Sequence, residues 1–211
     1  MFRNGRRNYI TMPIIDKIYL LVITLCATAS VLNPLSRQKK LWIYFITVFI
    51  AEIYAFFFEK TYPLKIYKYS ILIYCLYWCY YFLYRKNSTN FLLYFFSLLS
   101  VLTFLFDLFL TKRYFDSIPS IYLIILYQTV SLNFLFSEIK TPNEIHLYKK
   151  QKFWISISLT LWSIVFTFYI IPVYFFLETD LLFASIIEKI FQYTTILSYI
   201  LFLIGLLCKK E

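Results

Sequence analysis

The chain has 211 residues, of which 61% are hydrophobic and 15% charged, with a net charge of +10. A soluble domain is typically about 45–50% apolar and about 25% charged, so this composition excludes an ordinary soluble globular protein. The aromatic content of 23% excludes a disordered chain, and two glycines are too few for a Gly-rich phosphate loop. The remaining class is an all-α polytopic membrane protein, a bundle of transmembrane helices without a soluble domain.

Seven apolar segments follow one another along the chain, and each approaches the roughly 20 residues that a bilayer-spanning helix needs. A β-barrel is disfavoured, because its strands are about ten residues long and alternate strictly. The segments use nearly the whole length, so we expect residues 1–211 to form a single transmembrane domain. The predicted spans cover residues 14–32, 41–58, 66–83, 91–110, 118–136, 153–176 and 181–207.

The first span resembles a secretory signal, because basic residues precede its apolar run. Ala27-Thr28-Ala29 also fits a small-x-small cleavage site. The apolar run continues beyond this site, and many similar segments follow. We therefore expect an uncleaved first helix.

Glu52 lies in the middle of the second span, where an ionisable side chain is costly and is a functional candidate by default. One interpretation is a proton or cation site. The other is a neutral carboxyl that is hydrogen-bonded to a neighbouring side chain and stabilises the bundle. The sequence leaves both open.

Polar side chains also follow helical spacing in other spans. Tyr74 and Tyr77 belong to a tyrosine stripe in the third span, and Ser163 belongs to a Ser/Thr stripe in the sixth. These stripes fit either a polar cavity around Glu52 or close helix packing. The candidate intramembrane polar site consists of Glu52, Tyr54, Tyr74, Tyr77, Ser163, Gln192 and Thr195.

The basic residues lie almost entirely between apolar segments, which indicates contact with lipid headgroups rather than with nucleic acid. The longest polar connection, residues 140–152, is the expected contact surface for a protein partner. Its candidate contact residues are Lys149, Lys150 and Lys152.

The sequence offers few residues for catalysis. The single histidine, His146, lies in this polar connection, so no metal or cofactor is expected within the spans. A lipid-modifying enzyme would have to use Asp107 or Glu188 as its acid–base group.

Several short motifs resemble a group of small, uncharacterised seven-helix membrane proteins that are common in Bacteroidetes. The resemblance implies the same architecture and a bacterial inner (cytoplasmic) membrane. It transfers no catalytic residue. The motifs that carry it are Glu52 with Tyr54, the aromatic segment 67–84, the segment 131–135, Phe153-Trp154 and the segment 204–207.

Three functions are weighed. The first is a non-enzymatic multi-pass protein that acts as a sensor, accessory subunit or effector for a partner protein, with a homo-oligomer as one form of assembly. The alternative is a channel or proton/cation-coupled transporter that uses Glu52, and the third is a lipid-modifying enzyme.

Orientation is weakly encoded, because basic residues divide almost evenly between the two sides. Trp42 and Trp154 follow basic loops, and Glu178 and Asp180 mark an acidic one, which favours an outer N-terminus and an inner C-terminus.

Overall fold

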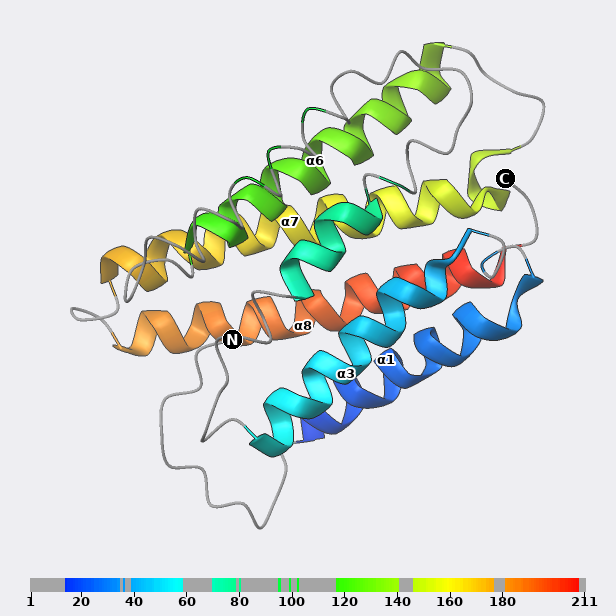
Figure 1. Ribbon diagram of the computed structural model, residues 1–211. Coiled ribbons are helices and arrows are strands. Elements are labelled where there is room, and N and C mark those ends of the chain that lie inside the picture. The colour runs from blue at the N-terminus through cyan, green and yellow to red at the C-terminus, as the bar shows by residue number, and fades with distance from the viewer. Residues whose placement is uncertain are drawn as a thin grey trace.

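The computed structural model describes residues 14–34, 36, 39–58, 70–78, 80, 95, 99, 102, 117–140, 146–176 and 181–208. These residues form an all-α bundle (Figure 1). A short 3-10 helix, η1 (Leu147–Lys149), precedes α7, and residues 70–78 are also helical. The long helices are α1 (Ile14–Leu32), α3 (Leu41–Phe58), α6 (Ser117–Lys140), α7 (Gln151–Phe176) and α8 (Leu181–Leu207).

Four described helices are long and apolar enough to cross a membrane, namely Ile14–Leu32, Ile121–Lys140, Gln151–Ile170 and Ser185–Leu207. The shortest of them has 19 residues, which gives about 28 Å of helix at 1.5 Å per residue. This length matches the roughly 30 Å hydrocarbon core of a bilayer. The apolar stretch of α3, Leu41–Tyr54, is shorter. The fold is therefore a helical bundle of membrane-protein type.

The described residues contain four candidate spans, which is fewer than the seven predicted. Of the predicted third span, 66–83, residues 70–78 and 80 are described, and they are helical. The predicted fourth span, 91–110, lies outside the described residues apart from three isolated positions. The predicted fifth span ends at residue 136, whereas α6 continues to Lys140. The extension is possible because Glu138, in the added turn, forms an ion pair with Lys150.

The helices pack in an order that differs from their order in the chain. α3 packs against α1, α1 against α8, α8 against α7, and α7 against α6. Small residues allow the close contacts, since the Ser158 hydroxyl donates to the Ser198 carbonyl over 2.7 Å. A Cβ added at Gly205 would lie 3.0 Å from the Cβ of Trp154, so only glycine fits without a shift.

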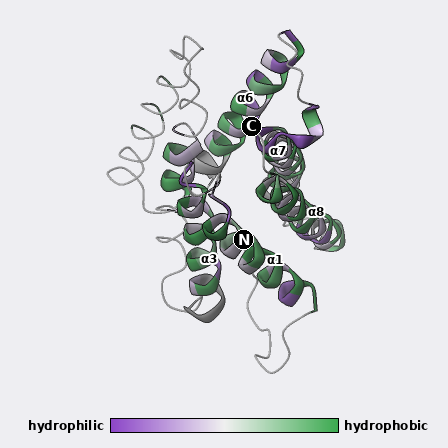
Figure 2. Ribbon diagram, turned by 90° about the vertical axis from the view of Figure 1, so that its right-hand side faces the viewer, coloured by the Kyte–Doolittle hydropathy of each residue, from purple (hydrophilic) through white to green (hydrophobic). Residues whose placement is uncertain are grey.

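A cluster of aromatic side chains lies in the interior of the bundle. Trp78 and Phe45 are fully buried, and Tyr44 and Phe202 pack against both of them. Figure 2 shows hydrophobic residues along the helices and hydrophilic residues near their ends. On α8 the exposed large side chains repeat every three or four residues, which is typical of a lipid-facing stripe. This stripe is formed by Leu182, Ile186, Ile190, Tyr193, Leu197, Ile200, Ile204 and Leu207.

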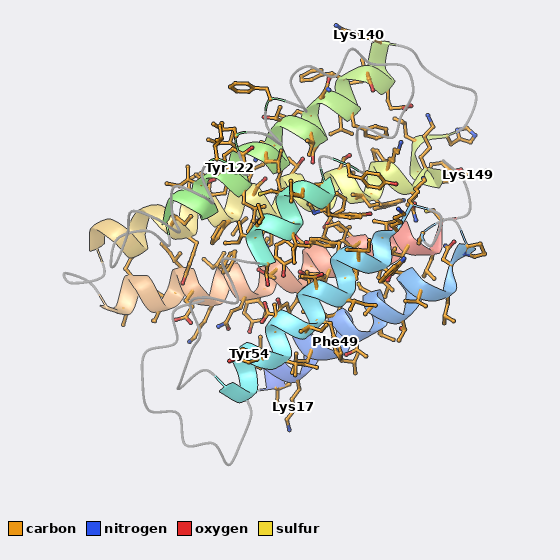
Figure 3. All side chains as sticks on the ribbon, viewed as in Figure 1. Lys17, Phe49, Tyr54, Tyr122, Lys140 and Lys149 are labelled. Atoms are coloured by element: carbon orange, nitrogen blue, oxygen red, sulfur yellow. The ribbon has the colours of Figure 1, made fainter. Side chains whose placement is uncertain are left out.

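The two ends of the bundle differ in charge. At one end α1 finishes, α3 begins, α6 finishes, α7 begins and α8 finishes. We call this the basic end, and its described lysines are Lys39, Lys40, Lys140, Lys149, Lys150 and Lys152. Figure 3 shows Lys140 and Lys149 at this end, and Lys17 and Tyr54 at the opposite end.

Candidate functional site

Glu52 is joined to the first helix by a hydrogen bond. The Tyr19 hydroxyl on α1 donates to Glu52 Oε1 on α3 over 2.9 Å, and the contact is partly buried. A carboxyl oxygen can accept this bond whether the group is protonated or ionised. The bond therefore survives a change in the proton occupancy of Glu52, and it couples that change to the packing of α1 against α3.

A cluster of tyrosines continues from Tyr19 into the bundle. The ring of Tyr19 lies edge-on to Tyr199 of α8, with 5.8 Å between ring centroids. The Tyr44 hydroxyl of α3 lies close to those of Tyr199 and of Tyr127 on α6, and it interacts electrostatically with both. Tyr44, Tyr127 and Tyr199 are all buried. Four helices, α1, α3, α6 and α8, thus contribute hydroxyl groups to one interior region.

Tyrosine hydroxyls both donate and accept hydrogen bonds, so a linked set of them can hold or pass a proton. We call Glu52, Tyr19, Tyr199, Tyr44 and Tyr127 the Glu52–tyrosine cluster. Among the residues that the structure describes, no group of three or more His, Cys, Asp or Glu side chains is placed to hold a metal ion. The cluster itself offers one carboxyl and four phenol groups.

Two predicted site residues of the third span lie beside this cluster. The Tyr74 ring packs edge-on against Tyr44, with centroids 5.1 Å apart. The Tyr77 ring also lies against Tyr44, while its hydroxyl donates to the carbonyl of Lys39 over 3.3 Å. Tyr74 thus extends the cluster, whereas Tyr77 directs its hydroxyl towards the basic end.

Ser163 belongs to a different contact. It accepts a hydrogen bond of 2.9 Å from Gln128 Nε2, which joins α6 to α7. Because these two helices run antiparallel, this pairing places Ser131 opposite Thr160, one turn nearer the basic end. The hydroxyls of Ser131 and Thr160 are buried without a hydrogen-bond partner among the described residues.

The other predicted residues are less connected to Glu52. The buried Thr195 on α8 donates to the carbonyl of Phe191 in its own helix, over 2.8 Å. Gln192 is half-buried on the same helix. Tyr54 lies one half-turn beyond Glu52, near the end of the bundle opposite Lys149 (Figure 3).

A second polar network closes the basic end. Gln151, the first residue of α7, is fully buried and donates through Nε2 to the Ser36 hydroxyl over 2.8 Å. Its Oε1 accepts from Lys39 Nζ at 3.4 Å. Asn33 Nδ2, at the end of α1, donates to the carbonyl of Leu206. At the basic end, side-chain hydrogen bonds therefore join the end of α1 to the end of α8, and the connection between α1 and α3 to the start of α7.

The lysines predicted to contact a partner differ in exposure. Lys150 and Lys152 are buried, and Lys150 forms an ion pair with Glu138 of α6. Lys149 is exposed. Of the three lysines predicted to contact a partner, Lys149 thus faces outward, while Lys150 belongs to the packing between α6 and α7.

Cys208, directly after α8, lies beside this network. Its Sγ is 3.9 Å from the carbonyl oxygen of Tyr148, to which the thiol donates. Burial raises the pKa of the Cys208 thiol above its ordinary value.

Sequence reasoning missed several members of the Glu52–tyrosine cluster. Tyr44 and Tyr127 sit among many aromatic residues, so composition does not single them out. Tyr19 had a usable signal, because Ile23, Cys26 and Ser30 follow it at spacings of four, three and four and are all fully buried. That spacing marks the inward face of α1.

The chain matches no protein-family model, no curated protein and no solved structure. The resemblance to seven-helix proteins of Bacteroidetes therefore stays a prediction from short motifs. The geometry of Glu52 and its neighbours carries the functional argument instead.

Proposed function

We propose that the chain is a non-enzymatic multi-pass membrane protein that acts as a sensor or accessory subunit for a partner protein. Its working part is the Glu52–tyrosine cluster. The observation that supports this role is the hydrogen bond from Tyr19 to Glu52 between α1 and α3. A carboxyl group at this position in a membrane helix is costly to keep unless it is used.

The sensing step is a change in proton or cation occupancy at Glu52. The ionised carboxylate accepts hydrogen bonds only, whereas the protonated carboxyl also donates one. The Tyr19 hydroxyl keeps its bond to Glu52 in both states. The added donor of the protonated carboxyl changes the electrostatic interaction of Glu52 with Tyr199 of α8. Because α1 packs against both α3 and α8, a small rearrangement there moves two helix interfaces at once.

The architecture within this proposal is the predicted seven-span bundle in a bacterial inner membrane, with the basic end on the cytoplasmic side. Among the described residues, the basic end has six lysines and one acidic residue, Glu138. Near the opposite end, the acids Asp16 and Glu188 balance Lys17 and Lys189. Excess Lys and Arg favour the cytoplasmic side. The C-terminal end of α8 therefore lies inside.

A second function, a proton- or cation-coupled channel or transporter, is favoured by one observation. The tyrosines near Glu52 do not end at Tyr199, because Tyr44 and Tyr127 of α6 lie beyond it and interact with each other. A chain that crosses the bundle could carry a proton across it, whereas a sensor needs only the Glu52 end.

The deciding variant is Glu52→Gln, because the amide oxygen can still accept the bond from Tyr19 but the group no longer titrates. In a purely structural role, the variant resembles the wild type. In the proposed role, the purified chain in lipid nanodiscs shows a pH-dependent change in tryptophan fluorescence that Glu52→Gln abolishes. Glu188→Gln is the matched control, since it neutralises another carboxyl on a candidate membrane helix and leaves the cluster intact.

Flux separates the two candidate functions. Proteoliposomes that contain a pH-sensitive dye report proton movement across the membrane. A sensor gives the fluorescence response without flux, whereas a transporter gives flux that Glu52→Gln removes. A wild-type protein with neither response, or a Glu52→Gln variant that retains both, contradicts the proposed role of Glu52.

A further inference from the structure

The exposed turn before α7 combines apolar, aromatic and basic side chains. In η1, Leu147 and Tyr148 are 41% and 56% exposed, and Lys149 next to them is also exposed. The His146 ring stacks on Tyr148, with centroids 5.4 Å apart and an interplanar angle of 15°. Lys149 Nζ lies 5.7 Å from the centre of the same Tyr148 ring. We call these four residues, 146–149, the η1 platform.

The η1 platform is held firmly although its side chains point outward. Backbone N–H groups of Lys149 and Lys150 donate to the carbonyls of His146 and Leu147, each over 3.0 Å. Trp154 Nε1 of α7 donates to the Tyr148 carbonyl over 2.7 Å. On the other side, the buried pair of Lys150 and Glu138 ties the turn to α6. Its exposed face is therefore preorganised for binding.

The position of the platform indicates what covers it. α7 begins at Gln151, two residues after η1 ends, and crosses the hydrocarbon from there. The platform thus lies at the depth of the lipid headgroups, at the end that also carries the exposed Trp42 and Lys40. Aromatic side chains favour this interface, and lysines there attract anionic headgroups.

We propose that the η1 platform binds the headgroups of anionic phospholipids. Lys149 meets the lipid phosphate, Tyr148 lies among the headgroups, and Leu147 reaches the top of the acyl chains. This inference is independent of Glu52 and of the proposed sensing function, because the two sites share no residue.

The test uses the purified full chain in neutral detergent, titrated with phosphatidylglycerol or phosphatidylcholine and measured by native mass spectrometry. Phosphatidylglycerol is expected to bind more tightly than phosphatidylcholine. Lys149→Gln is expected to weaken the binding of phosphatidylglycerol about fivefold, which is the effect of one lysine near an anionic surface. Tyr148→Ser is expected to weaken the binding of both lipids. Lys17→Gln is the matched control, because Lys17 is an exposed lysine at the opposite end beside Asp16.

Four outcomes overturn the proposal. Equal binding of the two lipids would show that the lipid charge plays no role. Equal losses of phosphatidylglycerol binding in Lys149→Gln and Lys17→Gln would show that binding does not depend on this site. Full competition by inorganic phosphate indicates a small-anion site instead of a lipid surface. Unchanged lipid binding by a Tyr148→Ser protein that no longer copurifies with a protein partner assigns the platform to that partner.

Discussion

Removing one member of the Glu138–Lys150 ion pair is expected to destabilise the bundle far more than removing both. The side chains are 4% and 3% exposed, so neither charge is well hydrated in the fold. Deleting one partner of such a pair costs about 3–5 kcal/mol, because the other charge stays buried without it. Replacing both by apolar residues of similar volume is often neutral.

The variants are Lys150→Met, Glu138→Leu and the double substitution, measured by reversible unfolding in mixed micelles as denaturing detergent is added. Each single variant is expected to lose about 3 kcal/mol of unfolding free energy, and the double variant less than about 1 kcal/mol. Lys149→Met is the control, because an exposed lysine contributes within about 0.5 kcal/mol. Single losses below about 1 kcal/mol, or a double loss equal to their sum, would refute a buried and coupled pair.

Two further predictions concern buried hydroxyls and a thiol. Ser131→Ala removes a buried hydroxyl without a described hydrogen-bond partner and is expected to raise the unfolding free energy by about 1 kcal/mol. Ser163→Ala removes the partner of Gln128 and is expected to lower the unfolding free energy by about 0.6 kcal/mol. A loss for Ser131→Ala together with a gain for Ser163→Ala in the same unfolding assay would contradict the pairing of α6 and α7. Because the pKa of Cys208 is raised, its thiolate fraction near pH 8 is smaller than that of a free cysteine, so maleimide is expected to label it more slowly and to gain rate up to a higher pH. Cys26 is fully buried and stays unlabelled in the folded protein, and a labelling rate at Cys208 equal to that of free cysteine would show that the thiol is not desolvated.

Hydropathy predicted several helix boundaries well. α1, α3 and α8 cover the predicted ranges 14–32, 41–58 and 181–207. Each of these ranges is bounded by polar or basic residues, and in lipid an apolar segment must satisfy its own backbone hydrogen bonds as a helix. Boundaries were less accurate at α6 and α7, where Glu138 and Gln151 are polar residues inside helices. A local hydropathy pattern assigns such polar residues to loops. In the structure they lie in helices, where they pair with residues of other segments.

The candidate site was predicted in part. Glu52 stood out because it is charged within an apolar segment. Its partner Tyr19 lies 33 residues earlier, and the partners of Gln151 lie 115 and 112 residues away. Contacts of that range depend on which helix faces meet, and apolar segments with polar residues on several sides do not specify this. The same reasoning explains why Lys150 and Lys152 were expected at the surface, since a lysine between apolar segments is usually solvated.

The position of α1 between α3 and α8 has a consequence for biosynthesis. α1 is the first described helix to leave the ribosome, but its contact with α8 forms only after the other described helices have been made. Until then the thiol of Cys26 has no access to the Tyr199 carbonyl that it contacts at 3.3 Å in the folded chain. The hydrogen bonds of Ser36 and Lys39 with Gln151 likewise form only after α7 has been made. The early helices therefore lack these polar contacts until α7 and α8 have been made.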